Sequence, residues 1–154
     1  MNKKIMLVYS TIHFIVDFSC AVLVANIITP QLTGSFSLFL AIAIYNFFAF
    51  AIQLPIGILA DKINKNTLCS ASGCILVILA FGISKFGIIS CLIAGIGNAM
   101  FHIGGGIDVL NISNKKATLP GIFVSTGALG IFLGSKVTNI NFNINYFSID
   151  FHQR

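Results

Sequence analysis

Five stretches of almost unbroken apolar sequence fill this chain, and each is long enough, or nearly so, to cross a lipid bilayer. The hydrocarbon core of a bilayer is about 30 Å thick, and a helix needs about 20 apolar residues to span it. The stretches are residues 5–29, 36–60, 67–84, 86–112 and 118–137. Only short polar joints separate them. The sequence therefore predicts an all-α membrane protein in which residues 1–137 form a bundle of about five transmembrane helices.

The composition excludes a soluble globular domain. Hydrophobic residues make up 56% of the chain and charged residues only 8%, whereas soluble domains carry about 25% charged residues. The net charge of +5 comes from lysines at the joints between the apolar stretches and not from a basic patch. We therefore expect the lipid bilayer as a partner and exclude nucleic acid.

The lysines also predict how the chain is oriented, because cytoplasmic loops are enriched in Lys and Arg. If every stretch crosses, three lysine pairs fall on one side: Lys3 with Lys4, Lys62 with Lys65, and Lys115 with Lys116. Only Lys85 and Lys136 fall within or beside joints on the other side. We predict a multi-pass protein of the cell membrane with a cytoplasmic N-terminus, whose first stretch is a retained helix and not a cleaved signal peptide.

Polar side chains are rare inside the five stretches, so those present are the candidate functional residues. They are His13, Asp17, Asn46, Asn98 and His102. His13 and Asp17 are four residues apart, as are Asn98 and His102, which puts the members of each pair on one face of a helix. A rise of about 1.5 Å per residue places Asp17, Asn46, Asn98 and His102 in one central slab. We expect these residues to line the path of a solute or a proton.

Two other roles are open to these residues. Asn, Gln and His often form hydrogen bonds between membrane helices. For Asn46 the sequence favours this structural role and a position on the solute path equally. For His13 with Asp17 a functional role is favoured, because a carboxylate at that depth is protonated, paired or wet. His13, Asp17 and His102 are also of the types that bind zinc. From the sequence, however, we predict neither a metal site nor a cofactor.

Small residues are concentrated inside the spans. The four cysteines, none of them in a C-x-x-C pair, are expected to pack as small apolar residues: they are Cys20, Cys69, Cys74 and Cys91. Glycines in residues 86–112 and 118–137 should let helix backbones approach closely. The glycine run at residues 104–106 should weaken or bend its helix.

The joint after the second stretch carries a recognisable pattern. Its key residues are Gly57, Asp61, Lys62 and Lys65. They resemble the signature loop of the major facilitator superfamily, G-x-x-x-D-R/K-x-G-R/K-R/K, and the loop follows the second span as it does in that family. Asn64 stands where the pattern has glycine, although asparagine also tolerates a left-handed backbone. Asn66 stands where the pattern has a basic residue.

A second stretch, residues 95–102, is similar to the fourth helix of bacterial members, including the branch of fosmidomycin-resistance exporters. The family often has an arginine in the outer half of that helix, used in proton coupling, and this chain has none there. The resemblance implies secondary active transport of a small solute by alternating access, with proton coupling as one mode. It also implies that the helices carrying His13, Asp17, Asn98 and His102 line a central cavity. A membrane-embedded enzyme is a further class, and we do not expect it, because the sequence offers only weak candidates for a nucleophile–base pair or a metal triad.

The length of the chain gives a further expectation. Members of this family have twelve helices in two six-helix halves, whereas five apolar stretches are present here. We therefore expect a truncated, inactive fragment that pairs with a second transporter half or with itself. The alternative is a small integral-membrane subunit or assembly factor without transport activity of its own. The remaining residues, 138–154, are rich in Asn, Ile and Phe and are expected to be a disordered tail.

Overall fold

The structure, a computed structural model, describes residues 3–137, and every regular element in this part of the chain is helical. The tail that we expected to be disordered, residues 138–154, lies outside the described residues. The α-helices are α1 (Lys3–Val22), α2 (Ser35–Asn46), α3 (Gln53–Ile63), α4 (Asn66–Gly82), α5 (Ile88–Ile112) and α6 (Thr118–Lys136). The expectation of an all-helical protein is confirmed.

Several α-helices are joined end to end into longer rods. After α1 the chain continues through a π-helical turn, η1 (Leu23–Ile28), and a 3-10 turn, η2 (Thr29–Gln31). A second π-helical turn, η3 (Phe47–Ala51), follows α2 and leads into α3. Within residues 3–137, four helical stretches are long and apolar enough to cross a membrane, and they are Lys4–Gln31, Ser35–Ile63, Ile88–Ile112 and Thr118–Lys136.

The count of spans therefore differs from the expectation of about five. The predicted span at residues 67–84 forms α4, an apolar helix of only 17 residues. It ends early because Ile83 leaves the helical conformation and a 3-10 turn, η4 (Ser84–Phe86), follows at once. Gly87, with φ of +47°, then completes the tight reversal into α5. Several apolar helices remain, which is compatible with a multi-pass membrane protein.

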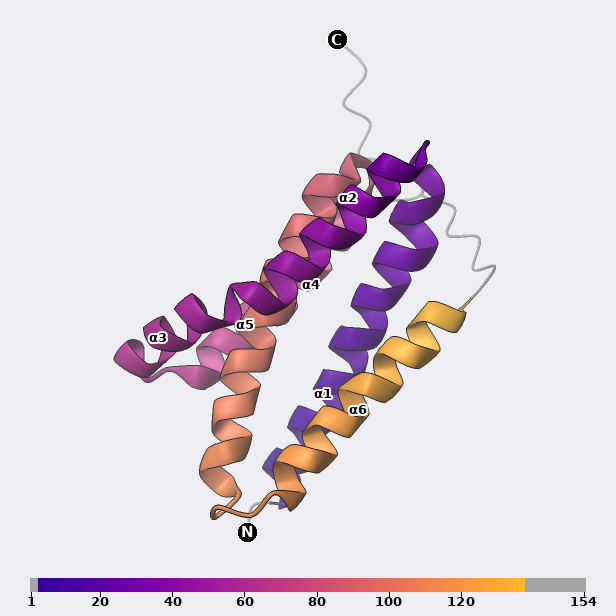
Figure 1. Cartoon of the computed structure of the whole chain (residues 1–154). Coiled ribbons are helices and arrows are strands. Elements are labelled where there is room, and N and C mark those ends of the chain that lie inside the picture. The colour runs from indigo at the N-terminus through magenta and orange to yellow at the C-terminus, as the bar shows by residue number, and fades with distance from the viewer. Residues whose placement is uncertain (1–2, 138–154) are drawn as a thin grey trace.

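The second rod bends where η3 meets α3. Ile52 has φ of −83° and ψ of 0°, which departs from regular helix. Pro55 follows in the first turn of α3 and cannot donate a backbone hydrogen bond. A π-helical turn and a proline are both recognised causes of helix kinks. Figure 1 shows the result, with α3 diverging from the bundle to which α2 belongs.

The bundle contains two close helix pairs, in which α1 lies along α6 and α4 lies along α5 (Figure 1). The helix α2 packs on α5 as well. Glycines make the contacts within both pairs close. A Cβ atom added to Gly97 of α5 would lie 2.7 Å from the carbonyl oxygen of Gly73 in α4. On α6, a Cβ at Gly130 would overlap the carbonyl oxygen of Phe14 in α1. Small residues therefore line the contacts, as expected for helices that associate in lipid.

The glycine run in α5 does not interrupt the helix, and the expectation that it weakens or bends α5 stays a prediction. The helix is continuous from Ile88 to Ile112. Gly104 packs against the backbone and Ser70 side chain of α4, and Gly105 packs against the ring of Tyr9 in α1. Close packing on two sides offsets the low helix propensity of glycine.

The two ends of the bundle differ in charge. One end is where α1 begins, α3 meets α4 and α5 meets α6, and we call it the lysine-rich end. It carries Lys4, Lys62, Lys65, Lys115 and Lys116. Asn64 ends α3 there with φ of +53°, in the left-handed conformation that asparagine tolerates. The orientation of this end toward the cytoplasm stays a prediction.

The core is filled by apolar side chains from all parts of the bundle. Phe101, Cys20 and Cys91 are fully buried within it. In contrast, α2 and α3 present large apolar side chains outward, among them Phe36 and Leu54, each 73% exposed. An apolar exterior of this kind suits contact with lipid.

Candidate functional site

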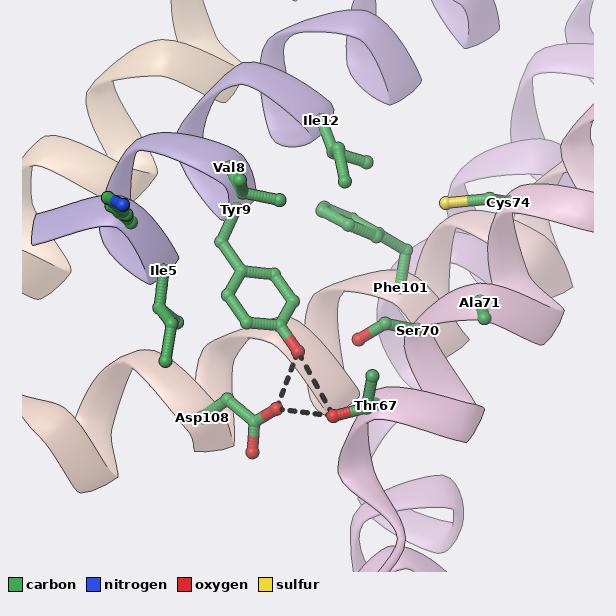
Figure 2. Close-up of a pocket in the computed structure, with 11 residues that line it drawn as sticks. Ile5, Val8, Tyr9, Ile12, Thr67, Ser70, Ala71, Cys74, Phe101 and Asp108 are labelled. Carbon is green, nitrogen blue, oxygen red and sulfur yellow. Dashed lines mark hydrogen bonds between the residues drawn. The ribbon is translucent and has the colours of Figure 1, made fainter. Parts of the chain in front are cut away.

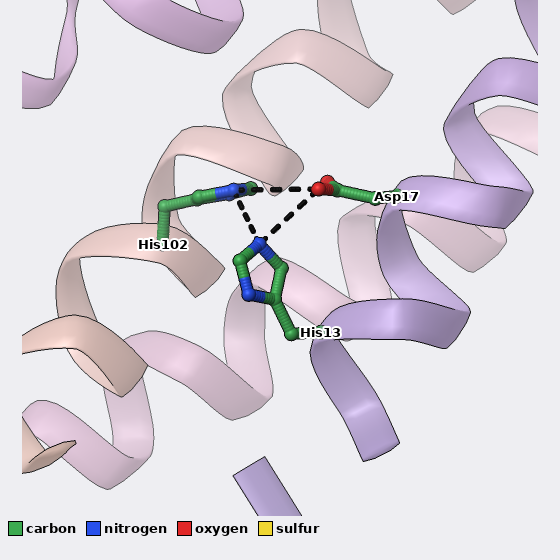
Figure 3. A group of neighbouring side chains, drawn as sticks. All are labelled: His13, Asp17 and His102. Atoms are coloured by element: carbon green, nitrogen blue, oxygen red, sulfur yellow. Dashed lines mark hydrogen bonds and ion pairs between the residues drawn. The ribbon is translucent and has the colours of Figure 1, made fainter. Parts of the chain in front are cut away.

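Four polar side chains meet in the interior of the bundle, near the middle of two long helices. His13 and Asp17 come from α1, and Asn98 and His102 come from α5. Asp17 lies midway along the rod that runs from Lys3 to Gln31. His13, Asp17 and Asn98 are only 2–3% exposed. Figure 3 shows His13, Asp17 and His102 converging on one point, and we call these three residues the central cluster.

The side-chain atoms that converge are two imidazole nitrogens and one carboxylate oxygen. Nε2 of His13 lies 2.8 Å from Nε2 of His102. Oδ2 of Asp17 lies 3.1 Å from Nε2 of His13 and 3.7 Å from Nε2 of His102. The i,i+4 spacing on α1 brings His13 to Asp17 as expected, and the packing of α5 against α1 adds His102.

The opposite ring nitrogens are held by backbone carbonyls. Nδ1 of His13 lies 2.7 Å from the carbonyl oxygen of Phe123 in α6, and Nδ1 of His102 lies 2.9 Å from that of Asn98. Because a carbonyl oxygen only accepts, each Nδ1 must carry the proton and donate. In a neutral imidazole the Nε2 atom is then an acceptor. When both rings are neutral, the two Nε2 atoms therefore face each other with lone pairs.

Asn98 fixes the carboxylate of Asp17. Its Nδ2 donates a 2.8 Å hydrogen bond to Oδ1 of Asp17. This bond assigns the amide orientation, because the opposite one would place two acceptors together. Oδ1 of Asn98 is buried and has no hydrogen-bond partner within residues 3–137. The second oxygen of Asp17, Oδ2, remains directed at the two histidines.

The third helix at the site, α6, closes one side of the central cluster. Gly127 lies so near that an added Cβ would overlap Nε2 of His13 and would lie 2.5 Å from Oδ2 of Asp17. His102 is the least buried member of the cluster, since its side chain keeps 20% of its surface exposed against 2–4% for His13 and Asp17.

Three acceptor atoms thus meet without a donor between them when both histidines are neutral. Lone pairs at these distances repel one another, and the carboxylate adds a negative charge. A cation among them, either a proton or a metal ion, removes that repulsion. In chemical terms, the arrangement is suited to binding a small cation.

Asn46, the fifth predicted path residue, is not brought to this place. It lies exposed on α2, and its Nδ2 donates to the carbonyl oxygen of Ile42 one turn earlier, 2.8 Å away. Its hydrogen bond stays within its own helix, so it is neither a member of the cluster nor a contact between helices. The depth estimate did not specify which face of α2 would turn inward.

The residues of the signature loop lie at the lysine-rich end, away from the cluster. Asp61, Lys62 and Lys65 are exposed, and within the described part of the chain Asp61 makes no ion pair. Gly57 has room for a side chain, since an added Cβ would meet only Ile103 at an ordinary 3.8 Å. Gly57, Asp61 and Lys62 thus belong to α3. Lys65 lies in the short turn between α3 and α4. The predicted role of the signature loop stays a prediction.

Sequence reasoning missed a second polar group, centred on Asp108 of α5 (Figure 2). Its Oδ2 accepts hydrogen bonds from Tyr9 of α1 at 2.5 Å and from Thr67 of α4 at 3.1 Å. Its Oδ1 accepts from Asn66 at 3.0 Å. These residues join three helices at the lysine-rich end, and we call them the Asp108 group.

A pocket of about 430 Å³ lies beside the Asp108 group. Its lining is mostly apolar and includes Ile5, Val8, Ile12 and Phe101, with Tyr9 and Asp108 at one edge (Figure 2). A signal for this group was present in the sequence. Tyr9, His13 and Asp17 are spaced by four residues and form one polar stripe along the first helix.

Comparisons with known proteins identify no relative of this chain. No protein family model matches the chain, no curated protein matches it, and no solved structure matches it. The resemblance to the facilitator superfamily therefore rests on the quoted loop and helix residues alone.

Proposed function

We propose that this chain is a membrane-embedded part of a secondary transporter, which moves a small solute across the membrane by alternating access. The central cluster is the place in this chain that the solute visits. The proposal covers the transporter class and the location of the path.

The observation that carries the proposal is the buried position of the central cluster. His13 and Asp17 are almost fully buried near the middle of a helix long and apolar enough to cross a bilayer. Ionisable groups at that depth are costly, and in membrane proteins they usually mark a pathway or a binding site. In many secondary transporters the substrate site lies near the bilayer midplane. The depth and chemistry of the cluster match such a site.

Two further features support the same class. The lysine-rich end gives the asymmetry expected of a multi-pass protein with one cytoplasmic face. The end of α3 and the turn after it carry the residues that resemble the facilitator signature, with Asn64 in the left-handed conformation that the glycine of the pattern would adopt readily. Neither feature alone identifies a transporter.

The proposal is tested by asking whether water reaches the cluster. In a chain whose four cysteines are replaced by alanine, a single cysteine is introduced by His102→Cys or, as the matched control, by Ile75→Cys. His102 is ten residues from the end of α5, and Ile75 is nine residues from the start of α4, at the same end of the bundle. Ile75 is 57% exposed on an apolar face. Both cysteines thus lie at similar depth.

A charged, membrane-impermeant thiol reagent then reports on water access, because the reactive species is the thiolate. We expect His102→Cys in membrane vesicles to react much faster than Ile75→Cys. If both cysteines are equally unreactive, the cluster is sealed and the transport proposal fails. The protein would then be better explained as a small membrane subunit in which the cluster holds α1 to α5.

A further inference from the structure

We propose that His13, Asp17 and His102 bind a divalent first-row transition-metal ion, such as zinc, manganese or iron. This metal-binding proposal rests on the proposed function and identifies the solute, since the ion is then the substrate that the transporter moves. The inference stands on the ligand types, on the spacing of their atoms and on the residues that hold the ligands.

The ligand types select the class of metal. Two imidazole nitrogens and one carboxylate oxygen suit zinc, iron, cobalt and manganese. Calcium and magnesium favour sites built from oxygen atoms alone, and the site offers a single carboxylate. Three protein ligands also leave a coordination position free for water or an exchanging ligand. A site that must release its ion needs such a position.

The spacing of the ligand atoms is close to what an ion requires. Bonds of about 2.0–2.2 Å in tetrahedral geometry place ligand atoms about 3.3 Å apart. The three separations here are 2.8, 3.1 and 3.7 Å. They bracket the required value, so rotations of the His13 and His102 rings by a few tenths of an ångström at their tips would complete the site. All three residues offer ligand atoms within 4.8 Å of one another.

The residues around the ligands already hold them in the metal-binding state. Metal-binding histidines usually donate their other ring nitrogen to a carbonyl or carboxylate, which fixes the tautomer. Both histidines do so here, through Phe123 and Asn98. The carboxylate of Asp17 is oriented by Asn98. The pattern extends over α1, α5 and α6, which is more than the i,i+4 pair on α1 requires.

A purely structural role explains these contacts less well. A hydrogen bond between His13 and His102 needs a proton on one Nε2, but both Nδ1 atoms already donate to carbonyls. One ring would then have to be a buried imidazolium. A metal ion satisfies all three acceptors with both rings neutral. The proton is the competing occupant, and the experiment separates the two.

The test uses the whole chain, Met1–Arg154, purified in detergent and stripped of metal by a chelator. Cobalt is the probe, because its visible absorption reports the number and type of ligands. We expect one cobalt ion per chain at micromolar concentration, with bands typical of four or five ligands including imidazole. Zinc should displace it, and magnesium should not. A folded chain that binds neither cobalt nor zinc at micromolar concentration overturns the proposal and leaves the proton as the occupant.

Matched variants locate the ion. His102→Ala and Asp17→Asn should each weaken binding by more than about 100-fold, because losing a ligand costs more than the 10–100-fold typical of an outer residue. His152→Gln, in the part of the chain outside the described residues, and Asp61→Asn, at the exposed loop, should bind normally. Binding that survives His102→Ala, or that is lost in His152→Gln, places the ion elsewhere and overturns the assignment.

A measurement on the unaltered chain guards against variants that fail to fold. Zinc should slow the acylation of His13 and His102 by diethylpyrocarbonate, as read by peptide mass spectrometry, and should leave His152 unaffected. Equal acylation with and without zinc counts against the site. The thiol-labelling experiment at His102→Cys tests the transport proposal separately. If cobalt binds but water does not reach the cluster, the transport proposal is wrong and the metal site stands. If water reaches the cluster but no metal binds, the metal site is wrong and the transport proposal stands.

Discussion

The hydroxyl of Tyr9 donates a 2.5 Å hydrogen bond to the carboxylate of Asp108, and this contact joins α1 to α5 at the lysine-rich end of the bundle. It lies one turn along α1 from His13, so the same helix face contacts α5 at two levels. One level is the Asp108 group, and the other is the central cluster. The first holds the helices together where the chain enters the bundle, and the second lies deeper.

Removing the Tyr9 hydroxyl should destabilise the bundle. Tyr9→Phe leaves a carboxylate oxygen of Asp108 with one donor fewer, and hydrogen bonds to charged groups contribute about 1.5–3 kcal/mol. Because Asp108 is only half-buried, we expect a loss of about 1 kcal/mol. Denaturant unfolding in detergent measures it. Asn46→Ala, which removes an exposed side chain bonded within its own helix, is the control and should change the stability little.

Gly127 should be sensitive to the addition of a single methyl group. Gly127→Ala forces a Cβ into His13 and Asp17, so α6 must move away or the two ligands must shift. We expect a loss of stability of about 1–3 kcal/mol, as for overpacked cores, together with loss of cobalt binding. The melting temperature and the cobalt spectrum report the two effects.

Gly121→Ala is the control on the same helix, because nothing lies within 4 Å of a Cβ at that position. It should be neutral or stabilising by up to about 1 kcal/mol, since alanine favours helix more than glycine. If Gly121→Ala and Gly127→Ala have the same melting temperature and the same cobalt spectrum, α6 does not pack closely on the cluster.

Asn98 should act on metal affinity without being a ligand. Asn98→Ala removes the hydrogen bond to Oδ1 of Asp17 but keeps the backbone carbonyl that holds His102. We expect cobalt affinity to fall by about 10–100-fold, with the absorption bands retained. An unchanged affinity would show that Asp17 is oriented by other contacts.

The orientation of the chain is tested from outside the cell. In the cysteine-free background, Asn64→Cys should resist an impermeant thiol reagent added to intact cells, and Lys85→Cys should react. Asn64 lies at the lysine-rich end, and Lys85 is exposed in the turn between α4 and α5 at the other end. The reverse pattern would place the lysine-rich end outside and contradict the charge-based prediction.

The helices were predictable because apolar length dominates their formation in lipid. Residues 86–112 and 118–137 became α5 and α6 almost residue for residue. The early end of α4 was less visible, since residues 67–84 contain no charged residue and no proline. The structure ends the helix through Ile83, the 3-10 turn η4 and the reversal at Gly87. The kink before α3 had one signal in the sequence, Pro55, whereas the π-helical turn η3 that precedes it is known only from the structure.

The part of the site that could be predicted is the contact between His13 and Asp17, because one helix supplies both residues. The spacing of His13 and Asp17 fixes their contact whatever surrounds them. His102 and Asn98 shared the right depth, but depth does not specify direction, which is why Asn46 was grouped with them and faces outward instead. The Asp108 group needs three helices in register, and helix register follows from packing that no single stretch of sequence contains.

The central cluster crosses the boundary between the two close helix pairs, since His13 and Asp17 belong to the α1–α6 pair and His102 to the α4–α5 pair. Metal–ligand distances tolerate changes of only about 0.2 Å. An ion held by all three residues would therefore cross-link the two helix pairs. If one pair slid along the other, a ligand atom would move out of bonding distance. Occupancy and displacement are then reciprocally linked: the ion resists the sliding, and the sliding expels the ion.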